Sequence, residues 1–282
     1  FMAPCFGTIA RLARGNGHTK VLCQIDNVEP HEHHLTDKLF NRYYLRSVDG
    51  FVYMSEQVRS ELCAYTDAPA LFSPHPLFEN FGERVARSEA CVRLGLDPAN
   101  RYVLFFGLIR DYKGLDLLLD AWTRLKRAGQ TEGRRLIVAG EFYTAKEPYL
   151  KQIADNGLQD EVLLHDRFIP DDEVKYYFSA ADFVVQPYKT ATQSGVTQIA
   201  YQFCVPMVVT KVGGLAEIVP DGRVGYVCEP TTAGVADAIE RMYEGDTLQR
   251  FRENCVEERR RFSWEEMCNR ITELYRVVTP EP

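Results

Sequence analysis

The sequence predicts an α/β protein with two domains, each a doubly wound parallel sheet, of which the N-terminal one is incomplete. From about residue 100 onward, short apolar runs alternate with amphipathic segments, which is the pattern of strand and helix units in a parallel sheet. The apolar runs are rich in Val, Ile and Phe without strict alternation, as expected for strands that are buried on both faces. A length of 282 residues fits one large or two medium domains.

The second part of the chain contains a complete set of alternating elements. Strands are expected at 102–106, 135–140, 161–166, 183–188, 206–210 and 225–230. Helices are expected at 114–125, 148–157, 171–182, 195–203 and 215–219. In the first of these helices, Leu115, Leu118 and Trp122 recur at helical spacing and form one apolar face. Within "IPDDE", Asp171 or Asp172 is expected to cap the helix that follows.

The first 86 residues contain fewer elements of the same kind. Strands are expected at 21–25, 50–55 and 69–73, and helices at 36–47 and 55–65. Three strands are too few for a full doubly wound domain. The Pro-rich segment 73–83 is typical of a connection between domains. Helices at 248–262 and 264–278 end the chain, so we predict domains at 1–86 and 87–262, followed by a helix within 263–282.

Composition restricts the classes of partner and the cellular location. The net charge of −7 disfavours nonspecific nucleic-acid binding, which relies on Lys and Arg. The eight cysteines are scattered, with no C-x-x-C and no zinc-like spacing, which favours reduced thiols and a cytoplasmic protein. No apolar run is long enough to span a bilayer. Because the first residue is Phe1, we expect the chain to be part of a longer protein.

The loop after strand 102–106 carries two cations. Gly107 allows a sharp turn, and Arg110 and Lys113 follow it before the next helix. Ligands of open parallel sheets bind at this edge, where strands end and helices begin. Both cations suit phosphate oxygens. The alternative is an ordinary surface loop whose cations pair with Asp111 or Asp116.

Two further loops are expected at the same edge. In residues 190–201, Ser194 precedes a helix, where it can either bind an anion or cap the helix. In residues 210–219, Glu217 falls in the first turn of a helix, where a carboxylate favours the helix dipole. Together the three loops predict a pocket for a diphosphate. The sequence contains neither a P-loop nor a G-x-G-x-x-G after the first strand.

Four segments occur in order over about residues 100–230: "FFGLIRDYKGLDLLLDAW", "VAGE", "FIPDDEVKYYFSAADFVVQPY" and "PMVVTKVGGLAEIVPDGRVGYVCEP". This part of the chain resembles the family-4 retaining glycosyltransferases of the GT-B fold (glycosyl transferase group 1). The resemblance implies a C-terminal domain that binds a nucleotide-sugar donor, and transfer of its sugar with retention to a hydroxyl of a glycan or polysaccharide. It also implies a last helix that crosses back toward the first domain, and an acceptor-binding role for residues 1–86.

The resemblance assigns roles to the residues of two loops. Lys113 and Arg110, beside Gly107, match the cations that hold the donor diphosphate, although Arg110 lies a few positions later than the usual Arg. Ser194, Gly195 and Val196 would give backbone donors to the phosphates.

The chain departs from the family's pattern at a pair of glutamates. The family carries E-x7-E near the last loop, one Glu for the donor sugar and the other for the ribose. This chain has no acidic residue between Asp182 and Glu217. We expect Gln193 and Gln198 to contact the sugar and ribose instead, since an amide can still hydrogen-bond a hydroxyl group.

The segment "QIDNVEPHEHH" follows a strand and is expected to face the cleft between the domains. Asn27 and His31 are candidates for contact with the acceptor. His31, Glu32, His33 and His34 also suggest a metal site, but their spacing gives no obvious tetrahedral set. We therefore expect no metal and no cofactor, with the nucleotide sugar as a substrate.

Other partners and two other functions stay open. Arg11, Arg14 and Lys20 either dock the protein at the inner face of a membrane or form a solvated face. If the strand 21–25 lies at an unpaired sheet edge, self-association is expected. The rival functions are a catalytically inactive donor-binding fragment and a sugar-nucleotide epimerase on the same fold, which would need charged acid and base groups.

Overall fold

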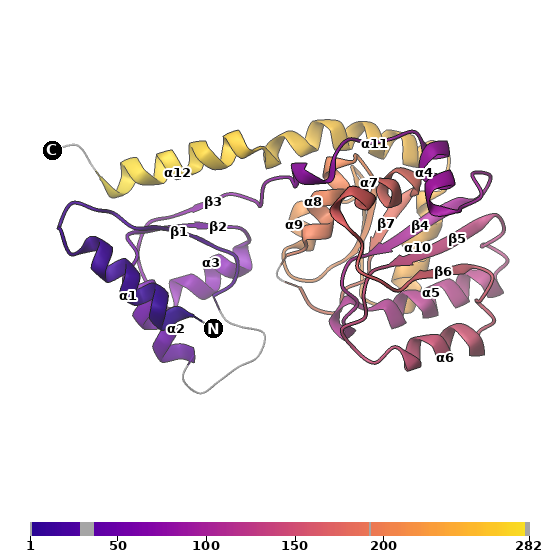
Figure 1. Ribbon diagram of the computed structural model, residues 1–282, viewed down its shortest axis with the longest axis horizontal. Coiled ribbons are helices and arrows are strands. Elements are labelled where there is room, and N and C mark those ends of the chain that lie inside the picture. Colours follow the sequence, from indigo (N-terminus) through magenta and orange to yellow (C-terminus); the bar gives the residue numbers. More distant parts are fainter. Residues whose placement is uncertain (1, 29–36, 192, 280–282) are drawn as a thin grey trace. The chain divides into compact units, whose positions relative to one another are not determined.

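The computed structural model describes residues 2–28, 37–191 and 193–279, which belong to two compact units (Figure 1). The first unit comprises residues 1–76 and 261–282, and the second comprises Leu77–Arg260. The sequence placed these divisions after residues 86 and 262. Residues 77–86 lie with the second unit because they bond to it: the Val85 amide donates to Ser179 Oγ at 3.1 Å, and Asn80 Nδ2 donates to Asp171 Oδ2 at 3.1 Å.

The second unit is built on one parallel six-stranded sheet. Its strands are β4 (Arg101–Phe106), β5 (Arg134–Ala139), β6 (Val162–His165), β7 (Phe183–Gln186), β8 (Met207–Thr210) and β9 (Gly225–Cys228). Their order is β6-β5-β4-β7-β8-β9. The order reverses between β4 and β7, and the crevice at such a switch point is where doubly wound sheets bind ligands. The predicted doubly wound parallel sheet is confirmed.

Helices cover both faces of this sheet (Figure 1). Val103 and Phe105 of β4 share a core with α5 (Leu115–Arg127), α6 (Glu147–Asp155) and α10 (Thr232–Met242). Phe106 points to the other face, where its ring centroid lies 5.1 Å from that of Phe178 in α7 (Asp171–Ala180). The helices α4 (Arg87–Leu94), α8 (Gly195–Gln202), α9 (Leu215–Ile218) and α11 (Thr247–Glu258) complete the unit. Burial on both faces explains the unbroken apolar strands.

Some local predictions differ from the structure. Helices α4, α10 and the N-terminal α1 were not expected, although Thr231 caps α10 by accepting from the Gly234 amide. The predicted cap of α7 is wrong, since Pro170 holds the cap position and neither Asp171 nor Asp172 caps through its side chain. Both carboxylates lie in the first turn, where they still favour the helix dipole.

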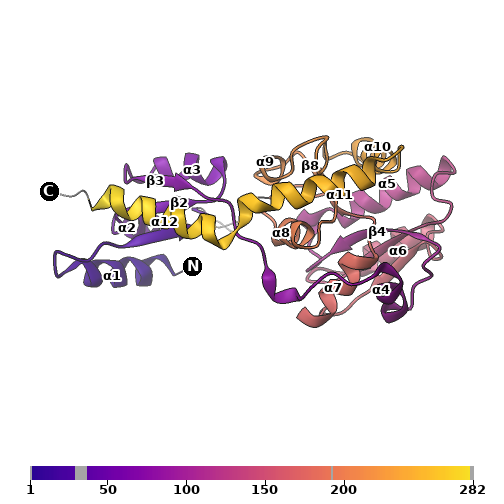
Figure 2. The same ribbon diagram turned by 90° about the horizontal axis from the view of Figure 1, so that it is seen from above.

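The first unit has a three-stranded parallel sheet in the order β1-β2-β3. Its elements are α1 (Ala3–Arg14), β1 (Leu22–Ile25), α2 (Asp37–Leu45), β2 (Gly50–Tyr53), α3 (Glu56–Cys63), β3 (Ala70–Phe72) and α12 (Trp264–Val278). Figure 2 shows α12 along this sheet. Val52 of β2 packs with Leu274 of α12, whereas Phe51 faces α2 and α3. In the described ranges no strand pairs with the outer flank of β1, so self-association there stays a prediction.

Two of the three cations proposed for membrane docking make contacts within this unit. Arg14 forms an ion pair with Asp49 at 3.0 Å. The Arg11 guanidinium donates to the Tyr43 carbonyl at 2.8 Å and lies over the Tyr43 ring. Of the described helices, none combines the length and the apolar character needed to cross a bilayer. Membrane docking stays a prediction.

Candidate functional site

Gly107 brings the first loop and helix α8 together at the end of β4. Its φ of +96° is accessible to glycine and strained for other residues. Its amide donates to the Ala139 carbonyl at 2.9 Å, which continues the ladder to β5. A Cβ at this position would lie 3.3 Å from Lys113 Nζ and 3.5 Å from Val196 Cγ2. Gly107, Lys113 and Val196 therefore meet at one point, at the switch point of the sheet.

Lys113 is largely buried, and no carboxylate of the described chain pairs with it. It belongs to a short 3₁₀ turn, Asp111–Lys113, that precedes α5. Burial, followed by the nearby Arg110, lowers the pKa of Lys113 to about 8. Its ammonium lies 5.8 Å from the centroid of the Tyr188 ring. An ammonium held in this way is prepared to receive an anion.

The neighbouring acids of this loop bind other groups. Asp111 accepts from Thr144 Oγ1 at 2.7 Å and from the Tyr149 hydroxyl at 3.1 Å. Asp116 forms an ion pair with Lys189 at 2.6 Å. The alternative in which Asp111 or Asp116 neutralises the loop cations is therefore wrong.

Arg110 precedes the same turn and is exposed. Its guanidinium carbon lies 5.3 Å from the centroid of the Tyr143 ring, and within the described ranges it has no ion pair. After burial, its charge is the second cause of the lowered pKa of Lys113. Arg110 and Lys113 therefore contribute positive charge to the same end of the sheet.

Ser194 stands at the start of α8 but does not cap it. It occupies the cap position without a side-chain hydrogen bond to the helix. Its hydroxyl lies 3.1 Å from the Tyr188 hydroxyl, and both side chains are buried. The capping interpretation is therefore wrong. Gly195 and Val196 form the first turn of α8, where backbone N–H groups lack acceptors within a helix and favour anions.

Tyr188 links the three loops, and the sequence analysis missed it. Its ring lies against Lys113, its hydroxyl contacts Ser194, and its carbonyl accepts from Thr210 Oγ1 at 2.6 Å. Thr210 ends β8 and leads into the third loop. The only sequence signal was an aromatic residue just after the apolar run of β7, which is equally common in ordinary cores.

Two predicted glutamines have buried amide atoms without hydrogen-bond partners. Gln198 lies on α8 with 1% exposure, and within the described ranges neither its Oε1 nor its Nε2 has a partner. Gln193 Nε2 and Gln186 Nε2, at the end of β7, also lack a hydrogen-bond partner among the described residues. The Gln186 amide oxygen accepts from Thr197 Oγ1 at 3.1 Å, so Gln186 packs against α8. Unpaired buried amides cost free energy and need an explanation.

A small pocket lies beside Gly107 at the ends of β4, β5 and β6. Its volume is about 190 Å³. Gly140 contributes close backbone contact, because a Cβ there would lie 2.1 Å from the Gly107 carbonyl oxygen. The sequence analysis missed this pocket, although "VAGE" and "FIPDDE" contribute to it. It is lined mainly by apolar groups, among them Phe81, Phe106, Phe168, Ile169 and Val174.

The candidates in the first unit are only partly described. Asn27 is exposed just after β1 and lines a cavity of about 290 Å³ with Asp26 and Asn41. His31 and the neighbouring Glu and His residues lie outside the described residues. Within the described ranges, no group of three or more His, Cys, Asp or Glu side chains is placed to hold a metal ion.

The family described as "Glycosyl transferases group 1" matches residues 100–245, just over half of the chain. This chain belongs to that family. The matched region contains β4 to β9 and all three loops, so the family's characteristic segment coincides with the site described above.

Curated relatives of this chain are similar over part of their length. D-inositol 3-phosphate glycosyltransferase of Pseudarthrobacter chlorophenolicus is 32% identical over 53% of this chain and 36% of its own length. Lipopolysaccharide core biosynthesis mannosyltransferase LpsB of Rhizobium meliloti is 31% identical over 65% of this chain and 51% of its own. The chain thus spans about a third to a half of the length of these relatives.

Solved structures show the fold. Sucrose-phosphate synthase from Thermosynechococcus elongatus matches with a TM-score of 0.79 at 19% identity, over 97% of this chain and 71% of its own. The Anabaena protein HepE in complex with UDP matches with a TM-score of 0.78 at 19% identity, over 96% and 76%. The predicted GT-B-like fold class is confirmed.

Proposed function

We propose that this chain binds a nucleotide-diphosphate sugar in its second unit and transfers the sugar, with retention, to a hydroxyl of a glycan or polysaccharide. The observation that carries the proposal is Lys113. Its ammonium is largely buried, lacks a carboxylate partner in the described chain, and meets Gly107 and Val196 at the start of α8. A diphosphate would supply the missing negative charge.

The chemistry at this point suits a departing diphosphate. As the glycosidic bond breaks, negative charge develops on the leaving phosphate oxygens. Fixed positive groups that already point at this charge lower the barrier, because they need no reorganisation. Lys113 supplies a point charge and Arg110 a planar donor fork, and the first turn of α8 adds backbone donors. Retention is carried over from the family resemblance alone, and we assign no protein nucleophile.

The surroundings offer places for the rest of the donor. The pocket of about 190 Å³ beside Gly107 has aromatic walls suited to a flat base. The unpaired amides of Gln193 and Gln198 suit the hydroxyls of the sugar and ribose. HepE is solved in complex with UDP and with UDP-glucose, which makes uracil the first base to test. In the first unit, we propose Asn27, which lines a cavity of about 290 Å³, as a contact for the acceptor.

Calorimetric titration tests the donor site. We would titrate UDP, GDP, ADP and their sugars into the wild type, Lys113→Ala and Lys151→Ala. Lys151 is the control because it is exposed on α6 and pairs with Asp155. One diphosphate should bind, and its affinity should fall about 10- to 100-fold in Lys113→Ala, as expected for a lost charge-assisted bond. Equal losses in both variants, or no binding to the wild type, would overturn the proposed site.

Product analysis then separates the three functions. The bound nucleotide sugar is incubated with oligosaccharide acceptors, and sugars and nucleotides are identified by mass spectrometry and NMR. Release of the nucleoside diphosphate with a glycosylated product of retained anomeric configuration supports transfer. Conversion to another nucleotide sugar would support an epimerase. Tight binding without any product would support a donor-binding chain.

A further inference from the structure

The second unit has another cavity, of about 540 Å³, where strands β4 and β7 begin. The donor site lies at the other end of these strands. Arg101 is the first residue of β4, and Asp182 directly precedes β7. Gly107 follows the other end of β4, so this six-residue strand separates the two sites by about 20 Å. The lining residues that matter here are Arg87, Arg101, Asp182, Tyr243 and Arg252.

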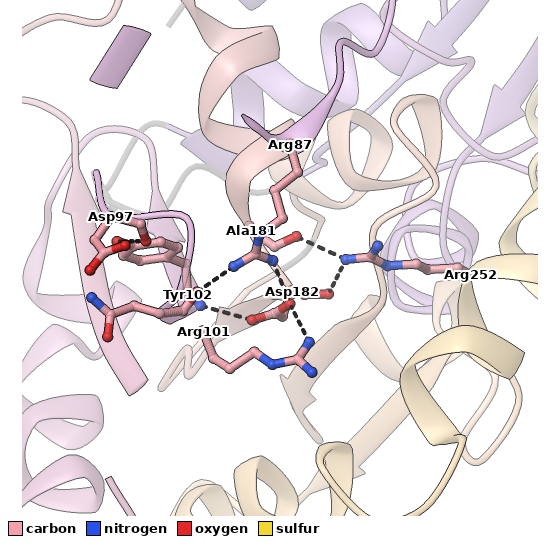
Figure 3. Close-up of polar contacts among 8 residues, drawn as sticks. Arg87, Asp97, Arg101, Tyr102, Ala181, Asp182 and Arg252 are labelled. Atoms are coloured by element: carbon pink, nitrogen blue, oxygen red, sulfur yellow. Dashed lines mark hydrogen bonds and ion pairs between the residues drawn. The ribbon is translucent and has the colours of Figure 1, made fainter. Parts of the chain in front are cut away.

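Three guanidinium groups converge on the Ala181–Asp182 segment (Figure 3). Asp182 Oδ1 accepts from Arg87 at 2.8 Å and from Arg101 at 3.4 Å. Arg252 Nη2 donates to two main-chain oxygens, the Ala181 carbonyl at 3.1 Å and the Asp182 carbonyl at 3.2 Å. One buried carboxylate therefore faces three positive charges.

The carboxylate already has a role in the fold. Asp182 Oδ2 accepts from the Tyr102 amide at 2.8 Å, which fixes the start of β4. The other acid lining the cavity, Asp246, is 81% exposed and pairs with Arg250 at 3.4 Å. Arg134 lies over the ring of Tyr243, 4.1 Å from its centroid, and pairs with Glu240 at 3.4 Å. No described carboxylate therefore balances the second and third guanidinium groups.

Two buried polar atoms at the cavity also lack partners. Among the residues that the structure describes, Arg252 Nε and the Tyr243 hydroxyl have no hydrogen-bond partner. Burial, followed by Arg84, lowers the pKa of Arg252. Asp182 opposes this shift, and Arg87 and Arg101 reinforce it. A network that served the fold alone would be expected to satisfy its buried donors. Because both atoms are enclosed by protein, the excess positive charge on the cavity wall, with Arg101 60% exposed, is what favours an anion.

We infer that this cavity binds the phosphate or diphosphate group of a small metabolite, at a site separate from the donor site. Its volume lies in the range of small-molecule sites. Guanidinium groups bind phosphate through paired, charge-assisted hydrogen bonds. Arg101 is 60% exposed and is the member most open to an incoming ligand.

NMR with inorganic pyrophosphate tests the site. The ¹⁵N-labelled chain is titrated at constant ionic strength, and the amides of Asn100 and Gly245 report on the cavity while Gly107 and Gly195 report on the donor site. We expect shifts in both groups. Arg101→Gln should weaken binding at the cavity about tenfold, as for one lost charge-assisted bond, and leave the Gly107 shifts unchanged. Lys113→Ala should do the reverse.

Two controls keep the test decisive. Arg124→Gln removes an arginine of similar exposure, 56%, which pairs with Asp237 away from the cavity. Gln249→Glu adds a negative charge among the residues lining the cavity and keeps all three arginines; it should also weaken binding there. The inference is overturned if the Asn100 and Gly245 amides do not shift, or if Arg101→Gln and Gln249→Glu titrate like Arg124→Gln.

Discussion

The hydroxyl of Tyr188 lies 3.1 Å from the hydroxyl of Ser194, and both side chains are buried. This contact joins the segment after β7 to the start of α8. The Tyr188 ring also faces the Lys113 ammonium, at 5.8 Å. One side chain thus holds the two loops that we propose to bind the diphosphate, and it fixes their separation before any ligand arrives.

Tyr188→Phe removes this contact while keeping the ring. We expect a loss of about 1 kcal/mol in the free energy of unfolding, since one buried hydrogen bond is lost. Nucleotide affinity should fall several-fold because the start of α8 becomes less well positioned. A double-mutant cycle with Ser194→Ala, by urea unfolding and calorimetry, measures the coupling. Strictly additive effects would show that the two hydroxyls do not act together.

Gly114→Ala should be among the most damaging substitutions in the chain. Gly114 has a φ of +69°, and a Cβ added to it would lie 2.1 Å from the Pro187 carbonyl oxygen. Gly129 has a similar φ of +72°, but a Cβ added there would meet no other group within 4 Å. Gly129→Ala should therefore cost about 1 kcal/mol from backbone strain alone, and Gly114→Ala about 4 kcal/mol or more. Thermal unfolding of the pair compares them, and equal costs would contradict the close contact.

Nucleotide-sugar affinity should depend on pH through Lys113. Its pKa is lowered to about 8, so the ammonium is charged below this pH and becomes neutral as the pH rises through it. Affinity should therefore fall above pH 8, by up to about tenfold per pH unit, and binding should take up protons there. Calorimetry in buffers of different ionisation enthalpy measures this uptake. Lys113→Arg stays charged and should bind without the dependence; an unchanged profile would assign it to another group.

The burial of Lys113 should lower the free energy of unfolding of the ligand-free protein. A pKa lowered from 10.5 to about 8 corresponds to about 3 kcal/mol against the charged form at neutral pH. Because the unfolded chain holds the proton more tightly, wild-type stability should rise as the pH increases from about 8 toward 10.5. Lys113→Met should be more stable at pH 7 and lack this rise. Urea unfolding at several pH values checks both, and a destabilised Met variant would contradict the account.

Gln198→Met should separate sugar recognition from diphosphate recognition. The wild-type amide is buried, and neither of its polar atoms bonds to a described residue, so an apolar side chain of similar length should leave the free protein equally or more stable. The affinity for UDP should be nearly unchanged, whereas the gain from the sugar group should be lost. Titrations of UDP and UDP-sugar measure the difference. If both ligands weaken equally, Gln198 shapes α8 rather than contacting the sugar.

Much of the fold was predictable because its signals are local. Leu115, Leu118 and Trp122 repeat at helical spacing and are buried in one core. The strands are recognisable in the same way, as short runs of apolar residues. Helix α1 escaped prediction because it buries small residues, Ala3, Gly7 and Ala10, and exposes Phe6, Ile9 and Leu12. Its hydrophobic pattern therefore gives no guide to its packed face.

The sequence by itself determined the doubly wound second unit, the family resemblance, and the loop that carries Gly107, Arg110 and Lys113. Only the tertiary structure decided that β4 and β7 are neighbours, that Lys113 lacks a carboxylate partner in the described chain, and that Ser194 turns to Tyr188 instead of its helix. The arginines around Asp182 were equally invisible, since they come from β4, α4 and α11. The physical reason is that charge pairing and burial depend on which distant segments meet, whereas helix and strand periodicity depend on the nearest residues along the chain.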